Sequence, residues 1–170
     1  MYNFNMTYII NFLSSKLSLT ALLLCMLITQ SDAAEYTNRQ KIALLQPIEH
    51  DAIIYGEGEK KVYVFVDPKC PHSRDFMTMI NENTKMRNIY RYYIFFYELK
   101  RFRSHDLIAA IYASPSPLQR TLEVMVGNKE IPTDTRIDPK IESKIEDIAR
   151  VADTIEISKR PYLIIMKENN

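Results

Sequence analysis

A single cysteine follows the apolar stretch VYVFV (62–66) and stands directly before a segment with helical spacing. The chain continues as DPKCPHSRDFM, so Cys70 precedes Pro71, His72 and Ser73. The nucleophile of thiol–disulfide exchange is a thiolate, and a helix N-terminus stabilises a thiolate through its unpaired N–H groups and its dipole. A cysteine at position 73 would make a redox pair. The serine leaves a C-x-x-S motif with one attacking sulfur.

Charged neighbours favour the thiolate of Cys70 further. A protonated His72 would add a positive charge near the sulfur, as would Lys69 and Arg160, and the Ser73 hydroxyl would donate a hydrogen bond to it. Plainer interpretations stand beside these. His72 is also typical of a solvated helix start, Arg160 of a strand entrance at the surface, and a single cysteine of a buried, inert position.

The elements around this motif are predicted from apolar spacing and turn residues. Residues 52–55 and 61–66 are typical of strands, and the turn at 56–59 between them predicts a hairpin. Pro71 lies in the first turn of the helix after the cysteine. Residues 89–97 (IYRYYIFFY) are almost continuously apolar or aromatic, which favours a central strand covered on both faces.

More helices are predicted between this strand and the last one. Cap signals at Ser104, Ser116-Pro117 and Asp138-Pro139 each begin a helix. The strand at 162–166 (YLIIM) follows Pro161, a residue confined to strand starts and able to form a cis bond. The order β-β-α-β-α-α-α-β predicts an α/β fold with a mixed sheet and helices on both faces.

The N-terminus has the pattern of an export signal. The apolar run 17–29 is too short for a typical membrane span and is followed by small residues at 33–34, so we expect residues 1–34 to be a cleaved signal peptide. An uncleaved membrane anchor is the alternative. Residues 35–50 are then a lead-in segment, and residues 51–170 the folded domain.

Composition narrows the functional classes. Of the two cysteines, Cys25 would leave with the signal, so the mature chain would hold Cys70 as its single thiol in an oxidising compartment. The formal net charge of +1 gives no indication of nucleic-acid binding. His50, His72 and His105 lack metal-ligand spacing with Cys70, and we expect neither a metal nor a cofactor.

Asp67, in the turn before the cysteine, is expected to cap that turn, with proton relay as the alternative.

The D-P-x-C-P-H-S motif after a strand, with a proline before a later strand, resembles the thioredoxin fold. Within it, the chain is similar to bacterial periplasmic thiol:disulfide interchange proteins of the DsbC/DsbG type. The similarity runs from about Asp51 to Met166 through DAIIYGEGEKKVYVFVD, IAAIYAS, LQRTLEVMVGNKEIP and KRPYLII. It implies a three-layer thioredoxin-like fold with a helical insertion.

The resemblance also implies roles for site residues. Cys70 corresponds to the exposed attacking cysteine, Pro71 and His72 to the dipeptide that tunes it, and Pro161 to the cis-proline that borders the substrate. Ser73 departs from the family because it replaces the resolving cysteine. Arg160 departs because a small or β-branched residue usually precedes the cis-proline.

Other departures concern whole segments of the family fold. The mature chain before Asp51 is too short for the family's N-terminal dimerisation domain, so the oligomeric state stays open. The sequence stops at Asn170, and we expect either that the usual last strand and C-terminal helix are absent or that the chain is truncated. The second cysteine pair of the isomerases is missing as well.

We therefore expect a periplasmic, exported protein that forms mixed disulfides through Cys70. It would act as a monothiol disulfide isomerase or reductase on cysteine-containing envelope proteins, with glutathione or another small thiol as a further partner. Net dithiol oxidation by this chain alone is excluded because Ser73 cannot resolve the intermediate. The alternative is a redox-inactive, client-binding or scaffold module of an envelope or secretion assembly.

Overall fold

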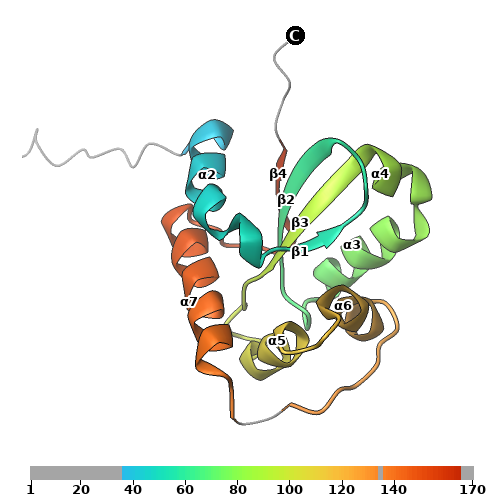
Figure 1. Cartoon of the computed structure of the whole chain (residues 1–170), viewed down its shortest axis with the longest axis vertical. Coiled ribbons are helices and arrows are strands. Elements are labelled where there is room, and N and C mark those ends of the chain that lie inside the picture. The colour runs from blue at the N-terminus through green and yellow to red at the C-terminus, as the bar shows by residue number, and fades with distance from the viewer. Residues whose placement is uncertain (1–35, 134–135, 166–170) are drawn as a thin grey trace, which may run out of the picture. The chain divides into compact units, whose positions relative to one another are not determined.

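The structure is a computed structural model, and it describes residues 36–133 and 136–165. Its centre is a four-stranded sheet in the order β1-β3-β2-β4 (Figure 1). The strands are β1 (Ile53–Tyr55), β2 (Lys60–Val66), β3 (Tyr90–Phe96) and β4 (Tyr162–Ile165). β2 and β3 run parallel, whereas β1 pairs antiparallel with β3 and β4 antiparallel with β2. The predicted signal peptide at residues 1–34 lies outside the described residues.

Helices lie on both sides of this sheet, as predicted. On one side are α2 (Asn38–Leu45) and α7 (Pro139–Thr154), and on the other are α3 (Pro71–Glu82) and α4 (Thr84–Ile89) (Figure 1). α5 (His105–Tyr112) and α6 (Pro117–Met125) form the helical insertion between β3 and α7. Three elements were not predicted: α4, and the α2 helix and 3-10 helix η1 (Gln46–Asp51) that the lead-in segment forms.

The predicted hairpin between the first two strands is wrong, because β1 pairs with β3 and not with β2. The reason lies in the turn that joins them. The N–H groups of Glu57 and Gly58 both donate to the Arg87 carbonyl oxygen, at 2.9 and 3.2 Å, so the turn is attached to the end of α4. A Cβ atom on Gly58 would lie 2.0 Å from the Ile89 carbonyl carbon. Only glycine allows the two backbones to approach this closely.

The two central strands form the middle of the hydrophobic core and determine where the cysteine loop begins. Residues 62–66 of β2 and 92–96 of β3 are all buried. Their parallel register places Phe65 against Phe95, with ring centroids 5.2 Å apart, and Tyr63 against Tyr93 at 5.3 Å. Burying one such ring stabilises the fold by roughly 1.5–3 kcal/mol. β2 is therefore a rigid base for the loop that begins at Asp67.

The predicted helix starts are confirmed, but their caps differ. Asp138 caps α7 by accepting a hydrogen bond from the Lys140 N–H. The Ser104 and Ser116 side chains make no such capping bond, although each occupies the position before its helix. Among the described residues, no helix has the length and apolar character needed to cross a bilayer.

Candidate active site

Cys70 stands at the N-cap of α3, immediately after the loop that leaves β2. Its thiol contacts the backbone carbonyl oxygen of Arg160, with Sγ and O 3.9 Å apart. The bond between Arg160 and Pro161 is a cis peptide. The fold therefore brings the cysteine and the proline-led strand β4 together from positions 90 residues apart in the sequence.

The cysteine is not exposed, which corrects the expectation of an exposed attacking thiol. Cys70 is 1% exposed, and Arg160, whose carbonyl it contacts, is 6% exposed. The physical reason is the position of the loop, which follows the five buried residues that end β2 and lies beside the segment that leads into β4. In this conformation the thiol is therefore not open to a disulfide as large as a client's.

A buried carboxylate organises the loop that carries the cysteine. Asp67 is fully buried, and its Oδ1 accepts a hydrogen bond from the Lys69 N–H at 2.8 Å. Its Oδ2 accepts from the Leu99 N–H at 2.6 Å and from the Ser104 hydroxyl at 2.8 Å. The expected turn cap is thus part of a larger network that joins the cysteine loop to the segment after β3. This role of Ser104 was missed because a serine before a helix predicts a cap.

Ser73 is also fully buried, and its hydroxyl belongs to the same network. The Ser73 Oγ accepts a hydrogen bond from the Asp67 N–H at 3.2 Å. Among the residues that the structure describes, the recorded partner of the Cys70 thiol is the Arg160 carbonyl and not this hydroxyl. A hydrogen bond from Ser73 to the thiolate stays a prediction.

Arg160 uses its guanidinium within the protein. Nε donates to the Tyr97 carbonyl oxygen at 3.0 Å, and one terminal nitrogen donates to the carbonyls of Ile157 and Lys159, both at 3.1 Å. The guanidinium carbon lies 3.8 Å from the centroid of the Tyr97 ring. Burial lowers the pKa of Arg160 from its ordinary value, while attraction from Tyr97, Asp67 and Cys70 acts in the opposite direction. The side chain therefore holds the segment that borders the sulfur, and its predicted role toward a substrate stays a prediction.

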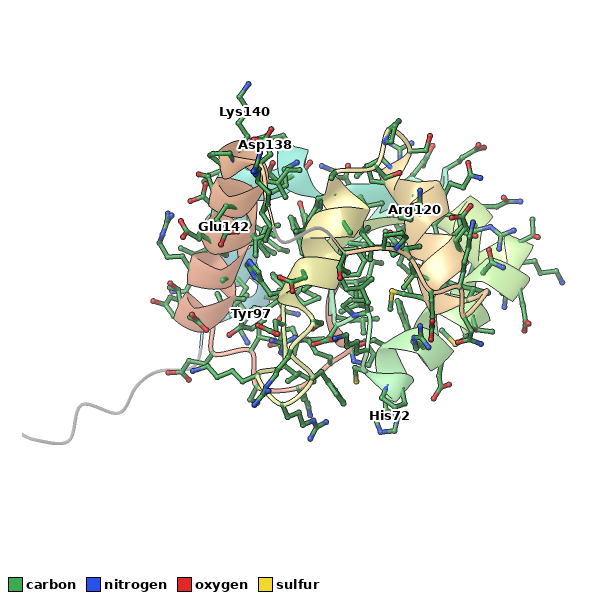
Figure 2. The ribbon with its side chains drawn as sticks, turned by 90° about the horizontal axis from the view of Figure 1, so that it is seen from below. His72, Tyr97, Arg120, Asp138, Lys140 and Glu142 are labelled. Carbon is green, nitrogen blue, oxygen red and sulfur yellow. The ribbon has the colours of Figure 1, made fainter. Side chains whose placement is uncertain are left out.

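The two residues between Cys70 and Ser73 lie on the outer face of α3. Pro71 and His72 are exposed, and Figure 2 shows the imidazole at the edge of the molecule. Its recorded partner is Asp75, with Nδ1 and Oδ2 4.0 Å apart and both side chains about 80% exposed. Lys69 directs its ammonium to the Arg103 carbonyl oxygen, at 2.7 Å. The tuning role of His72 stays a prediction.

The site is organised by hydrogen bonds and not by a metal-ligand cluster. In the part of the chain that the structure describes, no group of three or more His, Cys, Asp and Glu side chains is placed to hold a metal ion. His105 Nε2 lies 3.1 Å from a Glu142 carboxylate oxygen, which links α5 to α7 away from the cysteine (Figure 2 labels Glu142).

Comparison with known proteins finds solved structures of similar fold. No protein-family model matches the chain, and no curated protein matches it significantly. Solved structures do match. A transitional conformation of Proteus mirabilis ScsC superposes with a TM-score of 0.61 at 15% identity, over 94% of this chain and 84% of that one.

Two further structures agree with this match. A disulfide interchange protein from Neisseria gonorrhoeae gives a TM-score of 0.52 at 16% identity, over 68% of this chain and 79% of that one. The thiol-disulfide exchange protein α-DsbA2 from Wolbachia pipientis gives 0.52 at 14% identity, over 76% and 84%.

The fold is thioredoxin-like, with a helical insertion. The matching structures are named as ScsC, disulfide interchange and thiol-disulfide exchange proteins, and at these identities they show the fold alone. The narrower resemblance to the DsbC/DsbG type, and the chemistry of a single thiol, stay predictions.

Proposed function

We propose that this protein performs thiol–disulfide exchange through Cys70 alone, as a monothiol isomerase or reductase. The observation that carries the proposal is the position of the thiol, which is at the N-cap of α3 and 3.9 Å from the carbonyl of the residue before Pro161. Similar folds in proteins named for disulfide exchange support it. The first N–H groups of α3 favour negative charge at the sulfur.

The proposed reaction begins when the Cys70 thiolate attacks one sulfur of a client disulfide. A new S–S bond forms between Cys70 and the client, and the other client sulfur leaves as a thiolate. A client thiolate then attacks the mixed disulfide and releases Cys70 as a thiolate again. The cycle rearranges the client disulfide without net oxidation. With glutathione as the second attacking thiol, the same steps exchange the client's disulfide for one with glutathione.

Before this chemistry can begin, the client disulfide must gain access to the buried Cys70 thiol. Because Cys70 is 1% exposed, exchange requires a local opening of the segment held by Arg160. Local openings of this kind occur well below the free energy of global unfolding. We propose that the client meets the opened form, in the periplasm if residues 1–34 act as the export signal predicted from the sequence.

The proposal is tested by the rate at which Cys70 forms a mixed disulfide with a small aromatic disulfide under native conditions. We expect exchange to be faster than global unfolding, because a local opening exposes the thiol more often than global unfolding does. Cys70→Ala is the blank, and the unfolding rate is measured on the same preparation. Exchange that never exceeds the unfolding rate contradicts the proposal, because an inert core cysteine behaves in that way.

The second candidate is a client-binding or scaffold module without redox activity. The burial of Cys70 and the serine at position 73 favour it. Cross-linking in cells that express the wild-type chain or Cys70→Ala separates the two proposals. Partners that are captured equally by both chains, through contacts that survive reduction, support the module. Partners that are captured only by the wild type, and released by reductant, support exchange.

A further inference from the structure

A basic cavity opens beside the cysteine loop and has no part in the chemistry described above. Its volume is about 400 Å³, within the range of roughly 300–1,000 Å³ typical of ligand pockets. It begins at Lys69, the residue directly before Cys70, and extends to the end of α6 and the loop after it. Its charged lining consists of Lys69, Arg74, Arg103, Lys129, Asp106 and Glu130.

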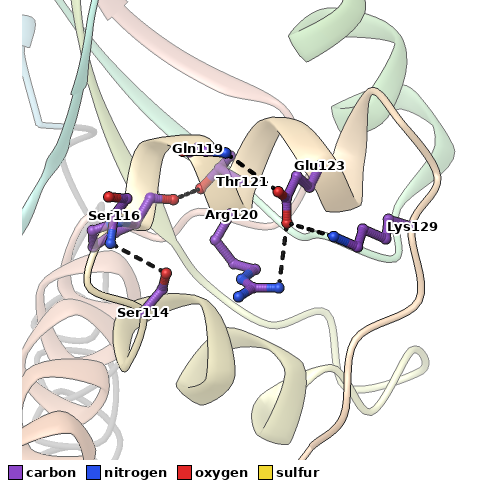
Figure 3. Close-up of polar contacts among 8 residues, drawn as sticks. Ser114, Ser116, Gln119, Arg120, Thr121, Glu123 and Lys129 are labelled. Carbon is purple, nitrogen blue, oxygen red and sulfur yellow. Dashed lines mark hydrogen bonds and ion pairs between the residues drawn. The ribbon is translucent and has the colours of Figure 1, made fainter.

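Most of the cations in this lining are not neutralised by a carboxylate. Among the described residues, the recorded acceptors of the Lys69 and Arg74 side chains are backbone carbonyls and one amide oxygen. Arg103 has no recorded side-chain partner there. Lys129 differs, because its ammonium lies 3.3 Å from a Glu123 oxygen that Arg120 also contacts (Figure 3). Three cations of the lining therefore have no described carboxylate within ion-pair distance, and together with the two carboxylates of the same lining they leave it a small net positive charge.

Two of these cations, Arg74 and Lys69, are also held in place by hydrogen bonds. Arg74 donates to the Pro68 carbonyl at 2.9 Å, to the Val124 carbonyl at 2.6 Å and to the Asn128 amide oxygen at 2.8 Å. It thereby joins the cysteine loop to α6 and to the loop beyond. A guanidinium has five N–H groups and an ammonium three, so Arg74 and Lys69 keep donors for a ligand. A fixed cation with spare donors loses little side-chain entropy when a carboxylate binds.

We propose that this cavity binds carboxylate groups of the molecule that exchanges with Cys70. The inference rests on the proposed function for the identity of that molecule, and the electrostatics of the cavity stand without it. One source of the carboxylates is acidic side chains close to a client cysteine. The other is glutathione, which carries two carboxylates. Either ligand would contact Lys69, the residue that precedes Cys70 in the chain.

The test uses ligands without a thiol, so its result does not depend on whether Cys70 reacts. Nuclear magnetic resonance titrations at low salt compare a blocked Gly-Glu-Gly-Glu-Gly peptide with its Gln counterpart, and include S-methylglutathione. We expect the Glu peptide to shift the amide signals of Arg103 and Asn128, and the Gln peptide to leave them in place. Binding of the Glu peptide alone assigns the site to polypeptide clients. Binding of S-methylglutathione, with or without the peptide, assigns it to the small thiol.

Charge-removing variants show where the ligand binds. We expect Arg103→Gln and Lys69→Gln each to weaken binding by about two- to fivefold, as for partly exposed ion pairs. Lys85→Gln is the matched control, because it removes one exposed charge from the first turn of α4, beyond the C-terminal end of α3 and outside the cavity. Equal shifts with the Glu and Gln peptides overturn the inference, as does equal weakening by Lys85→Gln. If exchange through Cys70 succeeds while this binding fails, only the cavity proposal is lost.

Discussion

The residues near the cysteine fall into an inner and an outer group. The inner group, Asp67, Cys70, Ser73 and Arg160, is at most 6% exposed, and hydrogen bonds connect its members to one another and to the segment after β3. The outer group, Pro71, His72 and Asp75, lies on the solvent face of α3. All of these residues except Arg160 lie between positions 67 and 75, yet only the inner group is placed to fix the sulfur. The chemical type of a residue in this stretch therefore says less about its effect than whether its side chain is buried.

The contrast between the inner and outer groups predicts the largest loss of stability for a substitution of Asp67. Asp67→Ala removes the acceptor of two backbone N–H groups and of the Ser104 hydroxyl, all close to a fully buried site. Donors left unpaired in the interior cost about 1–3 kcal/mol each, so we expect a loss of about 3–4 kcal/mol in the free energy of unfolding, measured with urea. Asp75→Ala, on the outer face, is the control and should change stability by less than about 0.5 kcal/mol. Equal losses would remove the distinction between the groups.

Arg160 should show the next largest effect. Arg160→Met keeps most of the side-chain volume but removes the hydrogen bonds to the carbonyls of Tyr97, Ile157 and Lys159. We expect the free energy of unfolding to fall by about 2–3 kcal/mol, as for hydrogen bonds to a charged group. The same change should loosen the segment over the sulfur, so native-state alkylation of Cys70 should become faster. Unchanged alkylation, despite lower stability, would mean that Arg160 does not control access.

A pair of matched serines, Ser73 and Ser114, tests whether burial makes a hydrogen bond important for stability. Ser73→Ala leaves the buried Asp67 N–H without its acceptor, at a cost of about 1–2 kcal/mol. Ser114 accepts the same kind of bond, from the Ser116 N–H at the same 3.2 Å, but at an exposed site (Figure 3). Water can replace that acceptor, so Ser114→Ala should cost less than about 0.5 kcal/mol. Urea denaturation of both variants measures the difference, and similar losses would show that burial does not decide it.

Much of the fold was predictable because apolar runs and cap residues are local signals. The central strands, the helix starts at Pro71 and Pro139, and the proline-led strand were all expected from short stretches of sequence. The pairing of the strands was not predictable in this way. The partner of β1 depends on the Arg87 carbonyl, which accepts the hydrogen bonds of the turn at Glu57 although it lies 30 residues later in the sequence. The same holds for the site. The position of Cys70 before a helix was a local signal, while its burial depends on a segment 90 residues further along.

The smallest effect is expected at His72, in the outer group. The His72 side chain is 80% exposed, so its charge is screened by water and salt before it acts on the sulfur. His72→Ala should therefore leave the free energy of unfolding within about 0.5 kcal/mol of the wild type. The rate of Cys70 alkylation should change only slightly, and still less in 0.5 M salt than in 20 mM salt. A large change in this rate that persists at high salt would place the imidazole close to the sulfur in the opened form, and would show that the outer face of α3 takes part in the chemistry.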